Sequence, residues 1–226
     1  MDATLDILYE DNHLIVINKK PSQIVQGDKT GDIPLPELIK AFLKEKYNKP
    51  GNVFCGVVHR LDRPTSGVVV FAKTSKALSR LTVEFKEKQT HKTYWAIVEN
   101  RPPKNAATLI DFLWKNEKQN KSYVVDKNKQ GAKQAILHYK LIKSSDHYHL
   151  LEIELETGRH HQIRCQLASI GCIIKGDVKY GAKRPNADKS ISLHARKLTL
   201  IHPTTKEELT FVAPVPNDDL WKFMEK

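Results

Sequence analysis

Residues 58–71 read VHRLDRPTSGVVVF and separate two apolar runs that are rich in β-branched side chains. Val53–Val58 leads into this stretch and Val68–Ala72 leads out of it, with turn-forming residues at their ends. Both runs therefore predict β-strands. Pro64 disfavours helical backbone at the residue before it, and Gly67 permits a tight turn. The connection between the two strands is expected to be short and stiff.

Asp62 lies in this connection between two arginines, Arg60 and Arg63. If the first strand continued to Asp62, Arg60 and Asp62 would point to the same face, because side chains alternate along a strand. A cluster of this kind is often a surface ion-pair network. It can also be a carboxylate that neighbouring cations keep ionised, ready to act as a nucleophile or base.

Nine residues of this stretch, His59–Gly67, read HRLDRPTSG and resemble the motif HRLDxxTSG of the RluA-type family of RNA pseudouridine synthases. In that family the aspartate of the motif is the catalytic nucleophile. The resemblance therefore implies that Asp62 is the nucleophile of an RNA-modifying isomerase.

A second match lies in the predicted strand HKTYWAIVEN, where Lys92–Val98 fits the family pattern KxYxAxV. Strand alternation places Tyr94, Ala96 and Val98 on one face, and a tyrosine there is commonly part of a core. The resemblance instead implies that Tyr94 lies beside the catalytic aspartate, where its ring can stack on the base and its hydroxyl can move a proton.

A third match is Thr157–Arg164, TGRHHQIR, which resembles the family motif TGRxHQIR. Ile163, Leu167 and Ile170 predict one apolar helical face, and Arg164 falls at its edge, where it requires a carboxylate partner. Any of the 26 acidic residues could be that partner by composition. The resemblance implies that it is Asp62. Many family members have histidine where this chain has Gln166, so the role of that residue is open.

The chain has 37 lysine and arginine residues and 26 aspartate and glutamate residues, which gives a net charge of +11. This balance favours a polyanionic partner. No apolar run is long enough for a transmembrane helix, so RNA is preferred over a membrane. The three scattered cysteines indicate a reducing compartment, and hence the cytoplasm. We expect no metal site and no cofactor, because the reaction is an isomerisation. We also expect a monomer.

The remaining elements predict a fold of the α+β class. It would have a mixed, largely antiparallel central sheet with flanking helices and a central active-site cleft, as the family implies. Residues 1–226 are expected to form one catalytic domain without a further RNA-binding module at the N-terminus. Residues 101–133 are lysine-rich and would be a hairpin or loop insertion, either an RNA-contacting arm or a solvated segment. Lys19 and Lys20 are interpreted as a solvated strand end.

The target uridine must leave its stack to reach Asp62, so base flipping is expected. Candidate RNA-binding residues adjoin the motifs: Arg60, Arg63, Thr65, Arg159, His161 and Gln162. The predicted substrate is a stem-loop of ribosomal or transfer RNA. Two alternatives remain: a basic RNA chaperone that kept the fold without the catalysis, and a metal-free hydrolase or nuclease that pairs Asp62 with His59 or His161.

Overall fold

The computed structural model describes residues 5–28 and 30–226. They form two compact units, which are described separately. Unit 1 contains the described residues up to His91 together with Ala195–Pro216, and unit 2 contains Lys92–His194 and Asn217–Lys226. The chain passes between the units within two strands, because β5 (His91–Val98) begins at the last residue of the first part of unit 1 and β10 (Leu193–Ile201) ends in unit 1.

The sheet of unit 1 has the strand order β1-β2-β4-β10, with β11 beside β10 and β3 beside β4. The pairs β1–β2, β2–β4, β3–β4 and β10–β11 are antiparallel. The strands besides β10 are β1 (Ile7–Glu10), β2 (Leu14–Lys19), β3 (Gly56–Val57), β4 (Ser66–Ala72) and β11 (Glu208–Val212). Strands β1 and β2 form an N-terminal hairpin.

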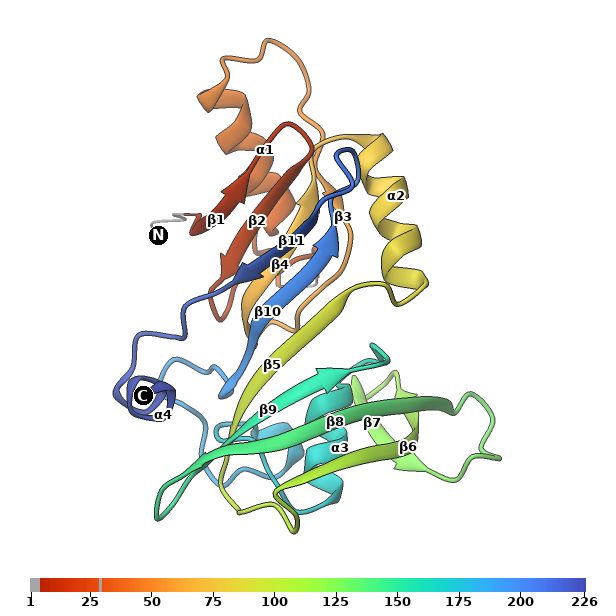
Figure 1. Ribbon diagram of the computed structural model, residues 1–226, viewed down its shortest axis with the longest axis vertical. Helices are drawn as coiled ribbons and strands as arrows, with labels where there is room; N and C mark the ends of the chain where they lie inside the picture. Colours follow the sequence, from red (N-terminus) through yellow and green to blue (C-terminus); the bar gives the residue numbers. More distant parts are fainter. Residues whose placement is uncertain (1–4, 29) are drawn as a thin grey trace. The chain divides into compact units, whose positions relative to one another are not determined.

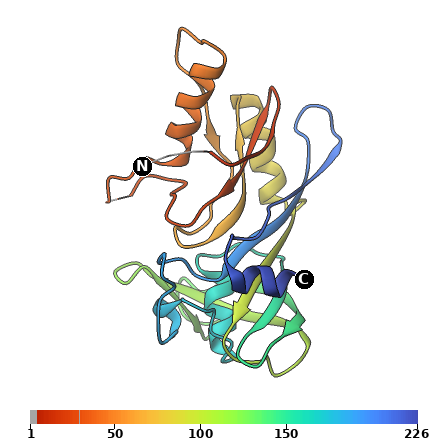
Figure 2. The same cartoon turned by 90° about the vertical axis from the view of Figure 1, so that its left-hand side faces the viewer.

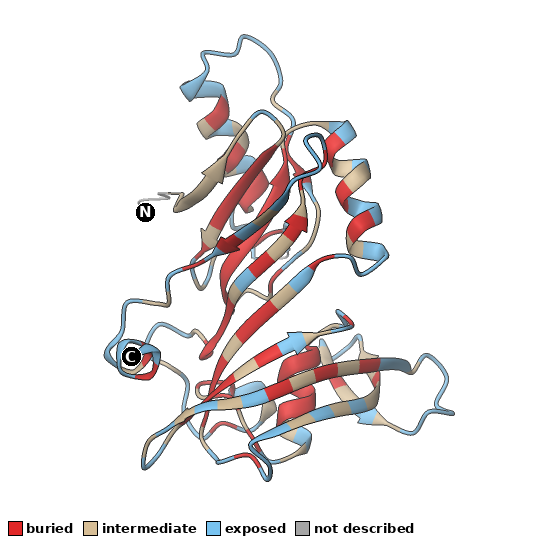
Figure 3. Ribbon diagram, in the orientation of Figure 1, coloured by how far each residue is buried: buried red, intermediate tan, exposed pale blue. Residues whose placement is uncertain are grey.

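All seven residues of β4 are buried, so both faces of this strand are covered (Figure 3). Helix α2 (Ser75–Lys86) packs on one face through Ala77 and Leu81 (Figures 1 and 2). The side chain of Thr74 caps α2 by accepting a hydrogen bond from the backbone N–H of Ala77. Helix α1 (Leu35–Lys46) buries the apolar side chains spaced at Leu35, Ile39 and Leu43.

The sheet of unit 2 has the order β5-β9-β8-β6-β7 with antiparallel neighbours throughout. Its strands besides β5 are β6 (Ala106–Asn116), β7 (Lys121–Val125), β8 (Lys133–Ser144) and β9 (His149–Leu155). Helix α3 (Gln162–Ser169) contacts β6, β7 and the short 3-10 helix η1 (Val178–Tyr180). Helix α4 (Asp219–Glu225) buries Trp221 and Met224. The mixed, mostly antiparallel α+β class is confirmed.

The lysine-rich segment 101–133 contains two regular strands. They are β7 and β6, which pair with each other as a hairpin, and β6 also pairs along most of its length with β8. The serine of β7, Ser122, is buried and its backbone N–H donates to the Tyr180 hydroxyl at 2.9 Å. The hairpin is therefore part of the sheet of unit 2 and is fastened to η1.

The stretch around Asp62 differs from the prediction in two details. Strand β3 ends at Val57, so Asp62 lies in an irregular connection and the alternation argument for Arg60 does not apply. Gly67 lies inside β4 with a φ of +115°, and a Cβ there would be 2.3 Å from the carbonyl oxygen of Ala195. Glycine is required by a close backbone approach rather than by a turn.

Candidate active site

A tight turn holds Asp62 in place. The backbone N–H of Thr65 donates to the carbonyl oxygen of Asp62 at 3.0 Å, which closes a four-residue turn around Arg63 and Pro64. Leu61 is 9% exposed and Thr65 is 2% exposed, so buried side chains anchor the turn on both sides of the half-buried Asp62. Asp62 is thus displayed from a fixed loop, as a reacting group requires.

Lys19 supports this turn from inside and was missed as a functional residue. Its side chain is fully buried, and its ammonium donates to the carbonyl oxygens of Lys20 at 3.1 Å, Arg63 at 3.1 Å and Thr65 at 2.6 Å. Burial lowers the pKa of Lys19 to about 7, although the charge of Asp62 opposes this shift. The interpretation of Lys19 as a solvated strand end was wrong, whereas Lys20 is exposed as expected.

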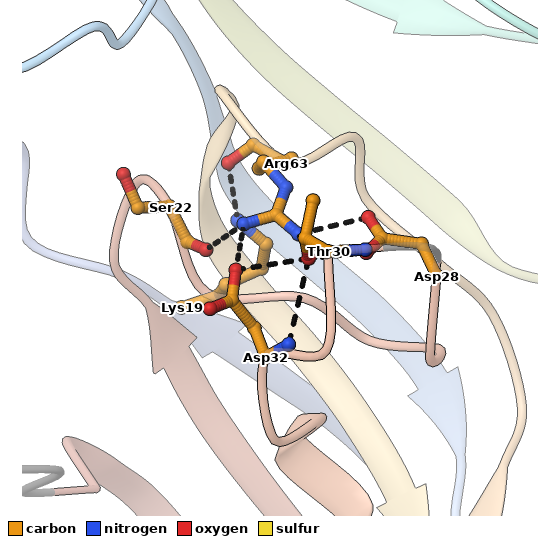
Figure 4. Close-up of polar contacts among 6 residues, drawn as sticks. All are labelled: Lys19, Ser22, Asp28, Thr30, Asp32 and Arg63. Carbon is orange, nitrogen blue, oxygen red and sulfur yellow. Dashed lines mark hydrogen bonds and ion pairs between the residues drawn. The ribbon is translucent and has the colours of Figure 1, made fainter.

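The side chain of Arg63 binds the segment between β2 and α1 (Figure 4). Its guanidinium donates to Asp28 at 2.8 Å, to Thr30 at 2.7 Å, to the carbonyl oxygen of Ser22 at 3.2 Å, and to Asp32. We name these five residues the Arg63 cluster. Hydrogen bonds from Arg63 hold the pKa of Asp28 and that of Asp32 below their usual range. Both carboxylates are therefore ionised at neutral pH.

The two histidines of the hydrolase alternative have structural contacts. His59 accepts a hydrogen bond from the backbone N–H of Val70 on Nε2 at 3.1 Å, and its ring stacks on Phe85. His161 is 8% exposed, stacks on His160 at 3.8 Å, and shares a hydrogen bond through Nδ1 with Tyr180 at 3.1 Å. These contacts give each ring a structural role within its own unit.

In unit 2, Arg164 is 5% exposed on α3 and is held by a carboxylate that the sequence reading did not single out. Its Nε donates to Oδ2 of Asp177 at 2.7 Å and its Nη2 donates to Oδ1 at 2.8 Å. The ring of Tyr180 lies 5.2 Å from the Arg164 Cζ. A buried guanidinium needs a carboxylate partner. The half-buried arginine predicted from the sequence was therefore the sign that an acid such as Asp177 must lie beside it.

Tyr94 is 9% exposed on β5, opposite Ile153 of β9. It belongs to unit 2 with Arg164, whereas Asp62 belongs to unit 1. The meeting of Asp62 with Tyr94 and Arg164 therefore stays a prediction, and so does the central cleft.

The other candidate RNA-binding residues fall into two groups. Arg60 and Arg159 are exposed, and each makes one polar side-chain contact, with Gln26 and with the carbonyl oxygen of Gln134, respectively. Thr65 and Gln162 are buried. The Gln162 amide binds Thr157, the backbone of Arg159 and the carbonyl oxygen of Ile136. This gives Gln162 a structural role at the start of α3, and RNA contact by any of these residues stays a prediction.

The open question about Gln166 has a structural answer. Its side chain is fully buried, and its Nε2 donates to the Asp111 carboxylate at 2.7 Å and to the carbonyl oxygens of Leu109 and Ala135. Gln166 thus ties α3 to β6 and β8.

Two negative findings concern the described residues. Across residues 5–28 and 30–226, the acids, histidines and cysteines form no group of three that could hold a metal ion. No helix in this part of the chain has the length and apolar character needed to cross a bilayer.

The family model described as RNA pseudouridylate synthase matches residues 13–169. The chain therefore belongs to this family, which confirms the resemblance and the enzyme class, an RNA pseudouridine synthase.

Individual relatives agree. An uncharacterized RNA pseudouridine synthase of Synechocystis is 35% identical over 94% of this chain and 66% of its own length. Ribosomal large subunit pseudouridine synthase C of Rickettsia prowazekii is 36% identical over 93% of this chain and 68% of its own length. The chain thus spans about two thirds of these relatives. The solved structure of human RNA pseudouridylate synthase domain containing 4 has 24% identity and a TM-score of 0.79, covers 96% of this chain and 91% of its own, and confirms the fold.

Proposed function

We propose that this protein converts specific uridines of ribosomal RNA to pseudouridine, with Asp62 as the nucleophile. The observation that carries the proposal is the braced position of Asp62. A hydrogen-bonded turn, two buried neighbouring side chains and the Lys19 ammonium fix the backbone around the half-buried Asp62. A chaperone that bound RNA by charge alone would have no use for a carboxylate held in this way beside two arginines.

The reaction breaks the bond between N1 of uracil and C1′ of ribose and forms a bond between C5 and C1′. The proton on C5 is lost and N1 gains a proton, so the product is an isomer of the substrate. Asp62 supplies the electron pair that holds the sugar or the uracil while the base turns. Tyr94 stacks on the uracil, and its oxygen takes the proton from C5 as its own hydroxyl proton passes to N1.

Arg164 provides the positive charge for Asp62 in this proposal. The bidentate pair with Asp177 uses Nε and Nη2 and gives the guanidinium a fixed orientation. The proposal is that this guanidinium also contacts Asp62. Such a contact would keep Asp62 ionised and oriented.

RNA binding in this proposal requires the uridine to leave its stack, at a cost of about a few kcal/mol that is lowest in a loop. Arg60 and Arg159, which are exposed, would contact flanking phosphates. Ribosomal RNA is favoured as the substrate because the printed name of the Rickettsia relative refers to the large ribosomal subunit. A stem-loop of transfer RNA is the second candidate.

The test is pseudouridine mapping after incubation with unmodified large-subunit ribosomal RNA and with unmodified transfer RNAs. Pseudouridine at defined ribosomal sites would support the proposal. If only transfer RNA were modified, the proposed reaction would stand and the proposed substrate would change to transfer RNA. RNA binding with no pseudouridine in either substrate would contradict the proposal and favour the chaperone.

A further inference from the structure

The two arginines that flank Asp62 in the sequence bind the same segment of chain. Arg63 contacts Ser22, Asp28, Thr30 and Asp32 in the Arg63 cluster (Figure 4). Arg60 donates from Nη1 to the side-chain oxygen of Gln26, which lies in the same connection between β2 and α1. The positive groups nearest to Asp62 in the chain are thus engaged by neighbouring acceptors, and two of those acceptors are ionised carboxylates.

The Arg63 cluster is exposed enough for an external anion to reach it. The side chain of Arg63 is 32% exposed, that of Asp28 is 41% exposed and that of Asp32 is 56% exposed. Exposed ion pairs contribute little to stability and are screened by salt, so replacing one anionic partner of Arg63 by another costs little free energy. The guanidinium fork accepts a phosphate in the same geometry as a carboxylate.

The positive charge of the whole chain gives a reason for carboxylates and RNA phosphates to compete for Arg63. With a net charge of +11, the protein attracts any RNA through counterion release, regardless of sequence or shape. Carboxylates that occupy Arg63 beside the catalytic turn oppose this general attraction at the place where the target uridine must enter. An RNA that positions a phosphate at Arg63 can displace them, whereas an RNA that does not is repelled.

We propose that Asp28 and Asp32 are specificity-determining residues that compete with the RNA backbone for Arg63. An RNA that places a phosphate at Arg63 displaces the two carboxylates. Any other RNA meets two negative charges next to Asp62. The proposal goes beyond the isomerase activity, because it concerns which RNAs are admitted to the site. It also accounts for an exposed arginine with four partners on a loop that carries the nucleophile.

The test measures binding of wild-type protein and of the Asp28→Asn/Asp32→Asn variant to poly(U), by fluorescence anisotropy at several salt concentrations. The variant should bind poly(U) about three- to tenfold more tightly at low salt, the size expected for two charges acting over several ångströms in water. Its plot of log affinity against log salt should be steeper by about 0.7, which corresponds to one further phosphate contact on a single strand. Unchanged or weaker binding would overturn the proposal.

A matched control separates a local effect from net charge. Asp146 and Glu208 are exposed, and the variant Asp146→Asn/Glu208→Gln changes the total charge by the same amount. Its affinity for poly(U) should change less than twofold. If this variant bound poly(U) as tightly as the Asp28→Asn/Asp32→Asn variant, the effect would be general electrostatics and the proposal would be wrong.

A double-mutant cycle tests whether Arg63 is the group in competition. Arg63→Ala in the Asp28→Asn/Asp32→Asn background should remove the gain in affinity, while Arg63→Ala alone should change poly(U) binding much less. A gain that persisted without Arg63 would overturn the proposal. Because these assays measure binding, they give an answer even if the wild-type protein forms no pseudouridine, and thermal unfolding shows that each variant is folded.

Discussion

The guanidinium of Arg164 is held by both carboxylate oxygens of Asp177, at 2.7 Å and 2.8 Å, and the side chains of the pair are 5% and 1% exposed. A buried pair of this kind is a poor source of stability, since removing two charges from water is costly. It is an effective way to fix a guanidinium in one orientation. Unit 2 thus presents Arg164 as a rigid group, and unit 1 presents Asp62 on a rigid turn.

Loss of the carboxylate at Asp177 should be costly, because it would leave the Arg164 charge buried without its partner. We expect Asp177→Ala to lower the free energy of unfolding by about 3–5 kcal/mol, measured by urea denaturation. Asp146→Ala removes an exposed carboxylate and should change it by less than about 0.5 kcal/mol. Equal stability of the two variants would show that the pair does not hold unit 2 together.

Lys19 should give the protein an unusual alkaline stability profile. Its pKa is lowered to about 7 in the folded chain from an ordinary value of 10.5. Between these values the unfolded chain binds more protons than the folded chain, so the free energy of unfolding rises with pH over this window, by about 5 kcal/mol in total. Lys19→Met should lack this rise. Parallel profiles for the two proteins from pH 7 to pH 10 would contradict the assignment.

Glu10 should give a pH dependence of the same sign at acid pH. Burial raises the pKa of Glu10, but hydrogen bonds from Lys46, Lys73 and Tyr47 outweigh it and lower the pKa to about 2. The carboxylate therefore contributes stability that is complete above pH 4.5 and is lost as the pH falls toward 2, about 2–3 kcal/mol overall. Urea denaturation of wild type and Glu10→Gln should differ at pH 6 and converge near pH 2. A constant difference would refute this prediction.

Gly67 should tolerate no side chain. With a φ of +115° and the Ala195 carbonyl oxygen 2.3 Å from an added Cβ, Gly67→Ala forces β4 and β10 apart. We expect a loss of more than about 3 kcal/mol in the free energy of unfolding, together with loss of activity from displacement of the catalytic turn. Gly51 has open space around it, so Gly51→Ala is the control and should be nearly neutral.

The sequence predicted those parts of the structure that depend on local periodicity. Helix α3 and strands β4 and β5 follow from apolar spacing. The prediction failed where a polar side chain forms its hydrogen bonds with backbone atoms that are distant in the sequence. Lys19 looks like a solvated strand end, because nothing near it in sequence shows that the carbonyl oxygens of Arg63 and Thr65 surround its ammonium.

The candidate site residues also divide into those that the sequence indicated and those that it did not. Asp62 and Arg164 were identified through motif resemblance, and their catalytic roles stay predictions. Asp177 could have been found by asking which acid satisfies Arg164, but composition offers too many candidates. The engagement of Arg63 by Asp28 and Asp32 depends on the path of a connecting segment, which no periodicity encodes.

The most direct measurement is the yield of pseudouridine in a single turnover on unmodified ribosomal RNA by wild type, by Asp62→Asn and by Asp146→Asn. The account predicts pseudouridine at the same sites with wild type and Asp146→Asn, and a loss of at least about a thousandfold in rate with Asp62→Asn despite normal RNA binding. Pseudouridine formation by Asp62→Asn at a rate near that of wild type would contradict the assignment of Asp62 as the nucleophile.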